Sequence, residues 1–130
     1  MVLLPADYMR LNGVHADLVK VVEKAAAGMP ADLGFIITEG LRSLARQRQL
    51  FAAHATQTMR SRHLTGHAVD LAVYLSGPKD VRWDWPLYHK LAFVVKAAAA
   101  AVNVPIEWGG DWDTFKDGPH FQLPWASYPA

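Results

Sequence analysis

The 130-residue chain contains no cysteine, which excludes disulfide bonds and thiolate metal ligands. Any metal ion must therefore be held by histidine and carboxylate side chains. A long apolar run is also missing, since no stretch approaches the roughly 20 apolar residues of a membrane span. The first residues lack the basic and apolar regions of a secretory signal peptide. We expect a protein that is synthesised in the cytoplasm and does not insert stably into membranes.

Neither sign of charge predominates. The chain has 13 basic and 12 acidic residues and a formal net charge of +1. Its overall electrostatics do not favour nucleic acid, and no nucleic-acid partner is expected. Arg60 and Arg62, just before His63, form one local basic run. This run is either a solvated loop or a patch that attracts an anionic substrate, and the charge pattern leaves both interpretations open.

Hydrophobic residues make up 52% of the chain, which is enough for a core. A domain of this size buries about two-thirds of the surface that its unfolded chain exposes. Two domains would be crowded in this length, and the sequence has no linker and no internal repeat. We therefore predict a single domain over residues 1–130, and we expect it to be a monomer.

Apolar periodicity and breaker residues indicate the secondary structure. Helical spacing of apolar residues predicts helices over roughly 14–27, after the capping residue Ser43, and from about 84 to 102. Short β-prone runs between breakers predict strands at 34–38, 68–74, 105–108 and 120–123. The polar stretch 55–62 is predicted to be a loop. Because helices and strands do not alternate strictly, the pattern favours an α+β fold with a small antiparallel sheet flanked by about three helices.

Histidine and aspartate side chains from two separated segments indicate a divided zinc site. Asp70 follows His63 by seven residues. Because Gly66 interrupts this stretch, the two residues are not expected to lie on one helix, as the ligands of an HExxH site do. Much later in the chain, His120 closes the segment Asp-Gly-Pro-His at 117–120. Two imidazoles and one carboxylate can hold Zn²⁺ and leave a fourth position for water, which is typical of a catalytic site. Asp70 falls in a predicted strand, so we expect the site at the sheet.

Asp117 lies three residues before His120 and is the candidate acid/base, which would take a proton from water and deliver it to a leaving amine. An alternative assigns Asp117 to a turn cap and His120 to a hydrogen bond in the core. Arg42 is the candidate cation for stabilising an oxyanion, although its position alone favours an ordinary surface arginine. The residues by themselves leave a catalytic and a structural interpretation open.

Several segments resemble the family of zinc D,D-carboxypeptidases and L-alanyl-D-glutamate endopeptidases, which includes phage endolysins. The matching segments are Ser-x-His-x-x-Gly-x-Ala-x-Asp at 61–70, Glu-Trp-Gly-Gly-Asp-Trp at 107–112, Asp-Gly-Pro-His-Phe at 117–121, and Gly-Leu-Arg-Ser at 40–43 followed by Gln47 and Leu-Phe at 50–51. The resemblance runs from about Phe35 to Leu123, which is most of the chain.

The resemblance implies a fold of the D,D-peptidase and hedgehog-like type with one Zn²⁺ per chain. The implied site consists of the zinc ligands His63, Asp70 and His120, the general base and acid Asp117, the transition-state-stabilising Arg42 and the substrate-binding Ser61. Many members of the family have glutamate where this chain has Asp117. Aspartate there resembles the phage L-alanyl-D-glutamate peptidases, which favours the endolysin branch.

Within that branch, the resemblance implies an endolysin of a phage that infects Gram-negative hosts, with no separate wall-binding module. Such an enzyme accumulates in the host cytoplasm, reaches the periplasm when the inner membrane is permeabilised, and hydrolyses the L-Ala–D-Glu bond of the peptidoglycan stem peptide. Two alternatives remain: a D-alanyl-D-alanine carboxypeptidase or dipeptidase, and a non-catalytic, zinc-stabilised wall-binding module. A regulatory Ca²⁺ is not predicted. The tryptophans at 83, 85, 108 and 112 are interpreted mainly as core residues.

Overall fold

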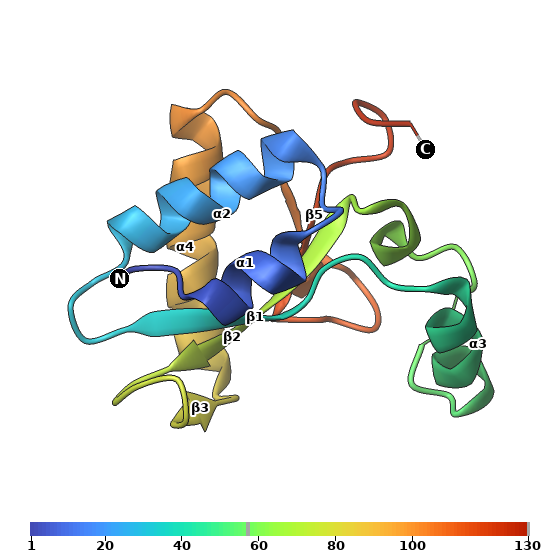
Figure 1. Cartoon of the computed structure of the whole chain (residues 1–130), viewed down its shortest axis with the longest axis horizontal. Helices are drawn as coiled ribbons and strands as arrows, with labels where there is room; N and C mark the ends of the chain where they lie inside the picture. Colours follow the sequence, from blue (N-terminus) through green and yellow to red (C-terminus); the bar gives the residue numbers. More distant parts are fainter. Residues whose placement is uncertain (57, 130) are drawn as a thin grey trace.

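The computed structural model describes residues 1–56 and 58–129; Gln57, within the predicted loop, and Ala130, at the end of the predicted domain, lie outside the described residues. The described chain forms four α-helices, two short 3-10 helices and five strands (Figure 1). In chain order these are α1 Pro5–Leu11, α2 Ala16–Gly28, β1 Gly34–Glu39, α3 Leu44–Ala52, η1 Arg62–Thr65, β2 Ala68–Tyr74, β3 Val81–Arg82, α4 Trp85–Ala101, β4 Glu107–Trp108, η2 Gly109–Asp111 and β5 His120–Gln122.

The strands form one antiparallel sheet in the order β1-β2-β5-β4, and β3 pairs with the far end of β2. The central strand is β2, which has β1 on one side and β5 on the other. Its register places Asp70 opposite Glu39 of β1 and opposite His120 of β5. The sheet therefore brings together polar residues that are far apart in the sequence.

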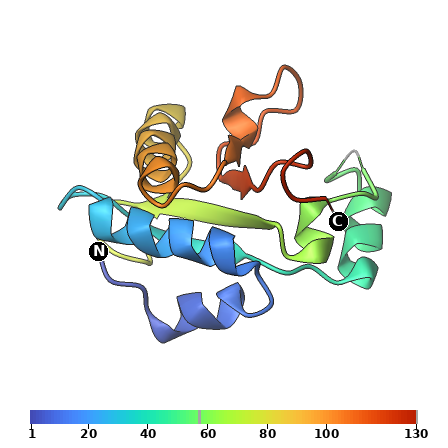
Figure 2. The ribbon, with the colours of Figure 1, turned by 90° about the horizontal axis from the view of Figure 1, so that it is seen from above.

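Helices α2 and α4 pack against each other, and α1 lies along β1 (Figure 1, Figure 2). Helix α3 stands apart from the other helices, on the side of the molecule where η1 lies. The core consists of the periodic apolar residues of α2, α4 and the central strand, among them Leu18, Val21, Val22, Leu91, Val95, Val69, Leu71 and Val73. Burial of each such side chain contributes about 1.5–3 kcal/mol of transfer free energy, which stabilises the sheet on which the polar residues stand.

The observed elements confirm the predicted α+β class and its antiparallel sheet. The prediction of about three helices missed α1, which has only seven residues and buries the charged Asp7. The Asp7 carboxylate accepts hydrogen bonds from the backbone N–H groups of Leu4 (2.9 Å) and Ile37 (3.1 Å). A carboxylate at a core position interrupts the apolar periodicity of a helix. The two N–H donors satisfy the hydrogen-bonding capacity of this buried carboxylate.

Two smaller expectations were wrong. Arg62 belongs to η1 rather than to the preceding loop. Most of the tryptophans at 83, 85, 108 and 112 were expected in the core, but of these only Trp108 is a core residue. Trp83 and Trp85 are 62% and 44% exposed. The Trp83 indole lies parallel to the Tyr88 ring, with 6.1 Å between ring centroids, so one ring face packs while much of the side chain stays in water.

Among the described residues, no helix combines the length and the apolarity needed to cross a membrane.

Candidate metal centre

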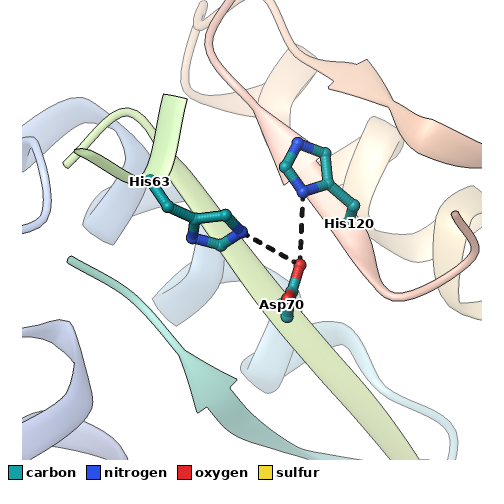
Figure 3. Close-up of side chains that lie close together, drawn as sticks. All are labelled: His63, Asp70 and His120. Atoms are coloured by element: carbon teal, nitrogen blue, oxygen red, sulfur yellow. Dashed lines mark hydrogen bonds and ion pairs between the residues drawn. The ribbon is translucent and has the colours of Figure 1, made fainter. Parts of the chain in front are cut away.

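Three side chains converge near the beginning of β2: His63, Asp70 and His120 (Figure 3). His63 Nε2 lies 3.3 Å from Asp70 Oδ1, and His120 Nδ1 lies 3.2 Å from the same oxygen. The potential ligand atoms are all within 4.8 Å of one another, and no other group of this kind occurs in the part of the chain that the structure describes. Two nitrogen donors and one carboxylate oxygen fit the ligand preference of Zn²⁺.

Local turn chemistry positions His63. The Ser61 hydroxyl caps η1 by accepting a hydrogen bond from the His63 backbone N–H (3.2 Å). Gly66 ends η1 in the left-handed conformation with φ of 75°, and a Cβ at this position would collide with the Gly13 carbonyl oxygen. The serine and the glycine of this motif therefore set the path of the backbone that carries the imidazole.

Sheet register and a tight turn position the other two side chains. Asp70 and His120 are direct partners across β2 and β5, and the Leu71 N–H donates to the Pro119 carbonyl (2.9 Å). The preceding turn is closed by the His120 N–H, which donates to the Asp117 carbonyl (3.3 Å). A Cβ on Gly109 would collide with that same carbonyl, so glycine permits the close approach of η2 to the turn.

Hydrogen-bond partners identify the donor nitrogen of each imidazole. His63 Nδ1 lies 2.8 Å from the Gly40 carbonyl oxygen, which can only accept, so Nδ1 carries the proton and Nε2 faces Asp70. His120 has the opposite arrangement, because its Nε2 lies 2.7 Å from Gln122 Oε1 and its Nδ1 faces Asp70. The arrangement thus presents His63 Nε2 and His120 Nδ1 toward one centre.

The surroundings of Asp70 favour its ionised form, because the two imidazoles place positive charge beside its carboxylate. Burial alone would raise the pKa of Asp70, but hydrogen bonds with His120 and His63, and the charge on those imidazoles, hold it well below its ordinary value. Burial opposes the charged form of His120, yet the pairing with Asp70 outweighs it and raises the pKa of that imidazole. A proton or a metal cation can supply the positive charge.

Asp117 lies beside the metal-ligand group and is not part of it. It lines the same cavity, and its pKa is raised by burial and by the negative charge of Asp70, against the opposing charges of His120, His63 and Arg42. A carboxyl whose pKa is raised can take up and release a proton closer to neutral pH, which general acid–base catalysis requires.

Arg42 is also at the cavity and is held firmly. Its Nε and Nη2 donate to the two carboxylate oxygens of Glu39 (2.5 and 2.7 Å), and its Nη1 donates to Gln47 Oε1 (2.7 Å). Burial lowers the pKa of this guanidinium, but the Glu39 carboxylate outweighs that effect and raises it. The surface-arginine interpretation is therefore wrong, because the Arg42 side chain is only 9% exposed.

The cavity that contains these groups has a volume of about 670 Å³. Both arginines of the basic run before His63 line this cavity, but their exposure differs. Arg60 lines the cavity and stacks over Trp125, with 5.2 Å from its guanidinium carbon to the ring centroid. Arg62 is 2% exposed and donates to the backbone carbonyls of Leu123 (3.0 Å) and Tyr128, so its main contacts hold the C-terminal segment.

Sequence reasoning assigned no role to Glu39, Gln122 or Glu107, although all three line the cavity. A signal was available for Gln122, because it follows His120 by two residues in a strand and must lie on the same face. The contact of Glu39 with Arg42 depends on the bend after β1 and had no comparable signal.

Comparisons with known proteins find a matching family, similar sequences and a similar fold. The sequence model of the family described as "Phage L-alanyl-D-glutamate peptidase" matches residues 5–123. The crystal structure of the Serratia marcescens L-Ala D-Glu endopeptidase ChiX is similar with a TM-score of 0.88 and 46% identity, over 97% of this chain and 92% of that one.

Two further relatives are similar in sequence. The L-alanyl-D-glutamate peptidase of Listeria phage A118 is 36% identical over 96 residues, which are 72% of this chain and 31% of the relative. This chain thus spans about a third of that protein's length. The peptidoglycan L-alanyl-D-glutamate endopeptidase CwlK of Bacillus subtilis is 30% identical over 132 residues, which cover 92% of this chain and 75% of the relative.

Proposed function

Because this chain belongs to the phage L-alanyl-D-glutamate peptidase family, we propose that it is a zinc-dependent endopeptidase that hydrolyses the L-alanyl-D-glutamate bond of peptidoglycan stem peptides. The observation that carries the proposal is the convergence of His63, Asp70 and His120, with ligand atoms within 4.8 Å of one another, in a cavity that also contains Asp117. The cavity volume of about 670 Å³ is large enough for a peptide segment to enter.

His63 Nε2, His120 Nδ1 and an Asp70 oxygen would hold the zinc ion. A bound zinc ion would supply a Lewis acid that makes water more acidic and polarises a carbonyl group. Asp70 and the two imidazoles come from three different elements, so binding requires the assembled sheet. Asp70 suits this role because its depressed pKa keeps it ionised at neutral pH.

Asp117 would move the proton. In peptide hydrolysis, one proton leaves the attacking water and one must reach the nitrogen of the departing amine. The raised pKa of Asp117 favours both uptake and release of that proton, and the position of this carboxyl outside the ligand group leaves it free to act.

Arg42 would stabilise the oxyanion that develops on the scissile carbonyl. Its charge is secured by Glu39, and a guanidinium has five N–H donors, of which its three bonds to Glu39 and Gln47 use only part. Ser61, whose hydroxyl caps η1 at the cavity wall, is the proposed substrate-binding residue.

The biological role that we propose is host lysis by a phage endolysin in which residues 1–130 form one catalytic domain. The enzyme would be synthesised in the host cytoplasm as a monomer, without a nucleic-acid partner, and would act on peptidoglycan in the periplasm once the inner membrane is permeabilised.

Digestion of purified peptidoglycan, followed by mass spectrometry of the released ends, tests the scissile bond. We expect new N-terminal D-Glu, together with loss of activity in a chelator and recovery with Zn²⁺. Release of D-Ala would replace the proposal with a D,D-carboxypeptidase or dipeptidase. Binding to the wall without any release of peptides would replace it with a non-catalytic module.

A further inference from the structure

A chain of side-chain hydrogen bonds that the proposed mechanism does not use leads from the surface of the cavity to His120. His120 Nε2 lies 2.7 Å from Gln122 Oε1, and Gln122 Nε2 donates to Glu107 Oε2 at 3.0 Å. We propose that Gln122, oriented by Glu107, is a positioning residue that holds His120 in the tautomer whose Nδ1 binds the metal. This inference rests on the proposed metal centre and deepens it.

The polarity of each group determines the direction of the chain. An ionised carboxylate can only accept hydrogen bonds, so Glu107 must face the amide NH₂ of Gln122. The reverse amide orientation would place an oxygen against the carboxylate and an NH₂ against His120. The amide oxygen of Gln122 therefore faces the imidazole, and His120 Nε2 must carry a proton to donate to it. In the neutral ring, the lone pair is then on Nδ1, which faces Asp70.

A second donor holds the carboxylate in place. Trp112 Nε1 donates to the same oxygen, Glu107 Oε2, at 3.0 Å. The sheet register also supports the chain, because Glu107 of β4 and Gln122 of β5 are direct partners. Gln122 and His120 are only 5% and 6% exposed, so water has little opportunity to replace the amide as the partner of Nε2.

The two imidazoles differ in how their tautomers are determined. The Nδ1–H of His63 donates to the backbone carbonyl of Gly40, which is an acceptor whatever the side chains are. The tautomer of His120 depends on side chains that substitution can change. Removal of a side chain that hydrogen-bonds to a metal-binding histidine typically weakens metal binding by about 10–100-fold.

Substitution at both positions tests the chain of hydrogen bonds. Gln122→Met keeps the length of the side chain and removes the acceptor, so we expect about 10–100-fold weaker zinc binding in competition with a chromophoric chelator. Glu107→Met removes the acceptor that orients the amide and should weaken binding in the same direction, although this residue does not touch His120. Glu107→Gln is the matched control, because an amide oxygen can still accept from both Gln122 and Trp112, and its zinc affinity should stay near that of the wild type.

A spectroscopic measurement separates positioning from general destabilisation. Long-range ¹H–¹⁵N spectra of the zinc-loaded protein should show a protonated Nε2 and a coordinated Nδ1 for His120 in the wild type and in Glu107→Gln. In Glu107→Met we expect a reduced or heterogeneous Nε2–H signal. If Gln122→Met does not fold, the comparison of Glu107→Met with Glu107→Gln still tests whether the chain of hydrogen bonds positions His120.

Wild-type zinc affinity and an unchanged His120 spectrum in Glu107→Met, or in a folded Gln122→Met, would overturn the inference. A wild-type protein that binds no zinc would instead refute the metal centre itself. Neither measurement depends on which peptide bond is cleaved, so failure of the proposed scissile bond is distinguishable from both results.

Discussion

Asp117 is the residue whose surroundings most clearly suit proton transfer rather than metal binding. Its carboxyl is half-buried beside the Asp70 carboxylate, and both effects raise its pKa. Its backbone, in contrast, has the structural task of closing the turn before His120 through the carbonyl oxygen. Substitutions that keep the backbone can therefore separate the two functions.

We predict that Asp117→Asn keeps zinc and fold but lowers kcat by about 10²–10⁴-fold, because an amide cannot accept and return the proton. The measurements are peptide release from purified peptidoglycan, zinc content and thermal denaturation. Activity within the error of the wild type would remove Asp117 from the mechanism. Loss of zinc together with activity would make Asp117 part of the metal site.

At the scale of elements, the 3-10 helix η1 connects the candidate metal centre to other parts of the fold. It carries His63, and carbonyl groups of η1 and of its C-cap residue accept hydrogen bonds from neighbouring segments: the Arg42 N–H donates to the His63 carbonyl (2.9 Å), and the His15 N–H donates to the Gly66 carbonyl (2.8 Å). The conformation of Gly66 therefore affects both the metal site and the packing of α2.

We predict that Gly66→Ala destabilises the protein by about 1–3 kcal/mol, because alanine is strained at positive φ and its Cβ would collide with the Gly13 carbonyl. Gly28→Ala is the matched control: it lies in α2 without positive φ, and its Cβ would make an ordinary contact at 3.7 Å with Val94. This second change should be neutral or stabilising by up to about 1 kcal/mol. Denaturant unfolding measures the free energy of unfolding of both variants. Equal effects of the two substitutions would contradict the requirement for glycine at position 66.

At the scale of the whole molecule, a metal ion bound to the ligand group would connect η1, β2 and β5, so its binding free energy would become folding free energy. Without a metal ion, a protonated His120 can pair with the Asp70 carboxylate. Because the pKa of His120 is raised in the folded state, its contribution to stability is complete below the ordinary histidine value of about 6.5 and is lost as the pH rises through the raised value.

Zinc binding requires unprotonated imidazoles, so its stabilising effect has the opposite dependence on pH. We predict that the difference in Tm between zinc-loaded and chelator-treated protein increases from pH 6 to pH 8. At a free zinc concentration of about 100 times Kd, the stabilisation should be about 2.7 kcal/mol. Thermal denaturation at several pH values, with and without chelator, measures it. A difference that is constant or shrinks with rising pH would count against the metal centre.

Sequence reasoning located most of the elements and the residues that meet at the centre, because those features depend on local chemistry. Alternation in β2, helical spacing in α2 and α4, and the few side chains able to bind a metal in a chain without cysteine are all visible along the sequence. Helix α1 was missed because its buried Asp7 is satisfied by a strand distant in sequence. A short amphipathic helix with a charged core residue has no clear local signature.

The sequence by itself determined the family, the fold class and the three possible metal ligands His63, Asp70 and His120. These features depend on motif spacing and periodicity, which are properties of neighbouring positions. Only the tertiary structure decided which nitrogen of each imidazole faces the centre, and that Arg62 is buried against the C-terminal segment. Those outcomes depend on partners such as Gly40 and Leu123, which are brought into contact only by the folded sheet and its flanking segments. Hydrogen-bond direction and burial are properties of contacts between distant residues, and no local pattern encodes them.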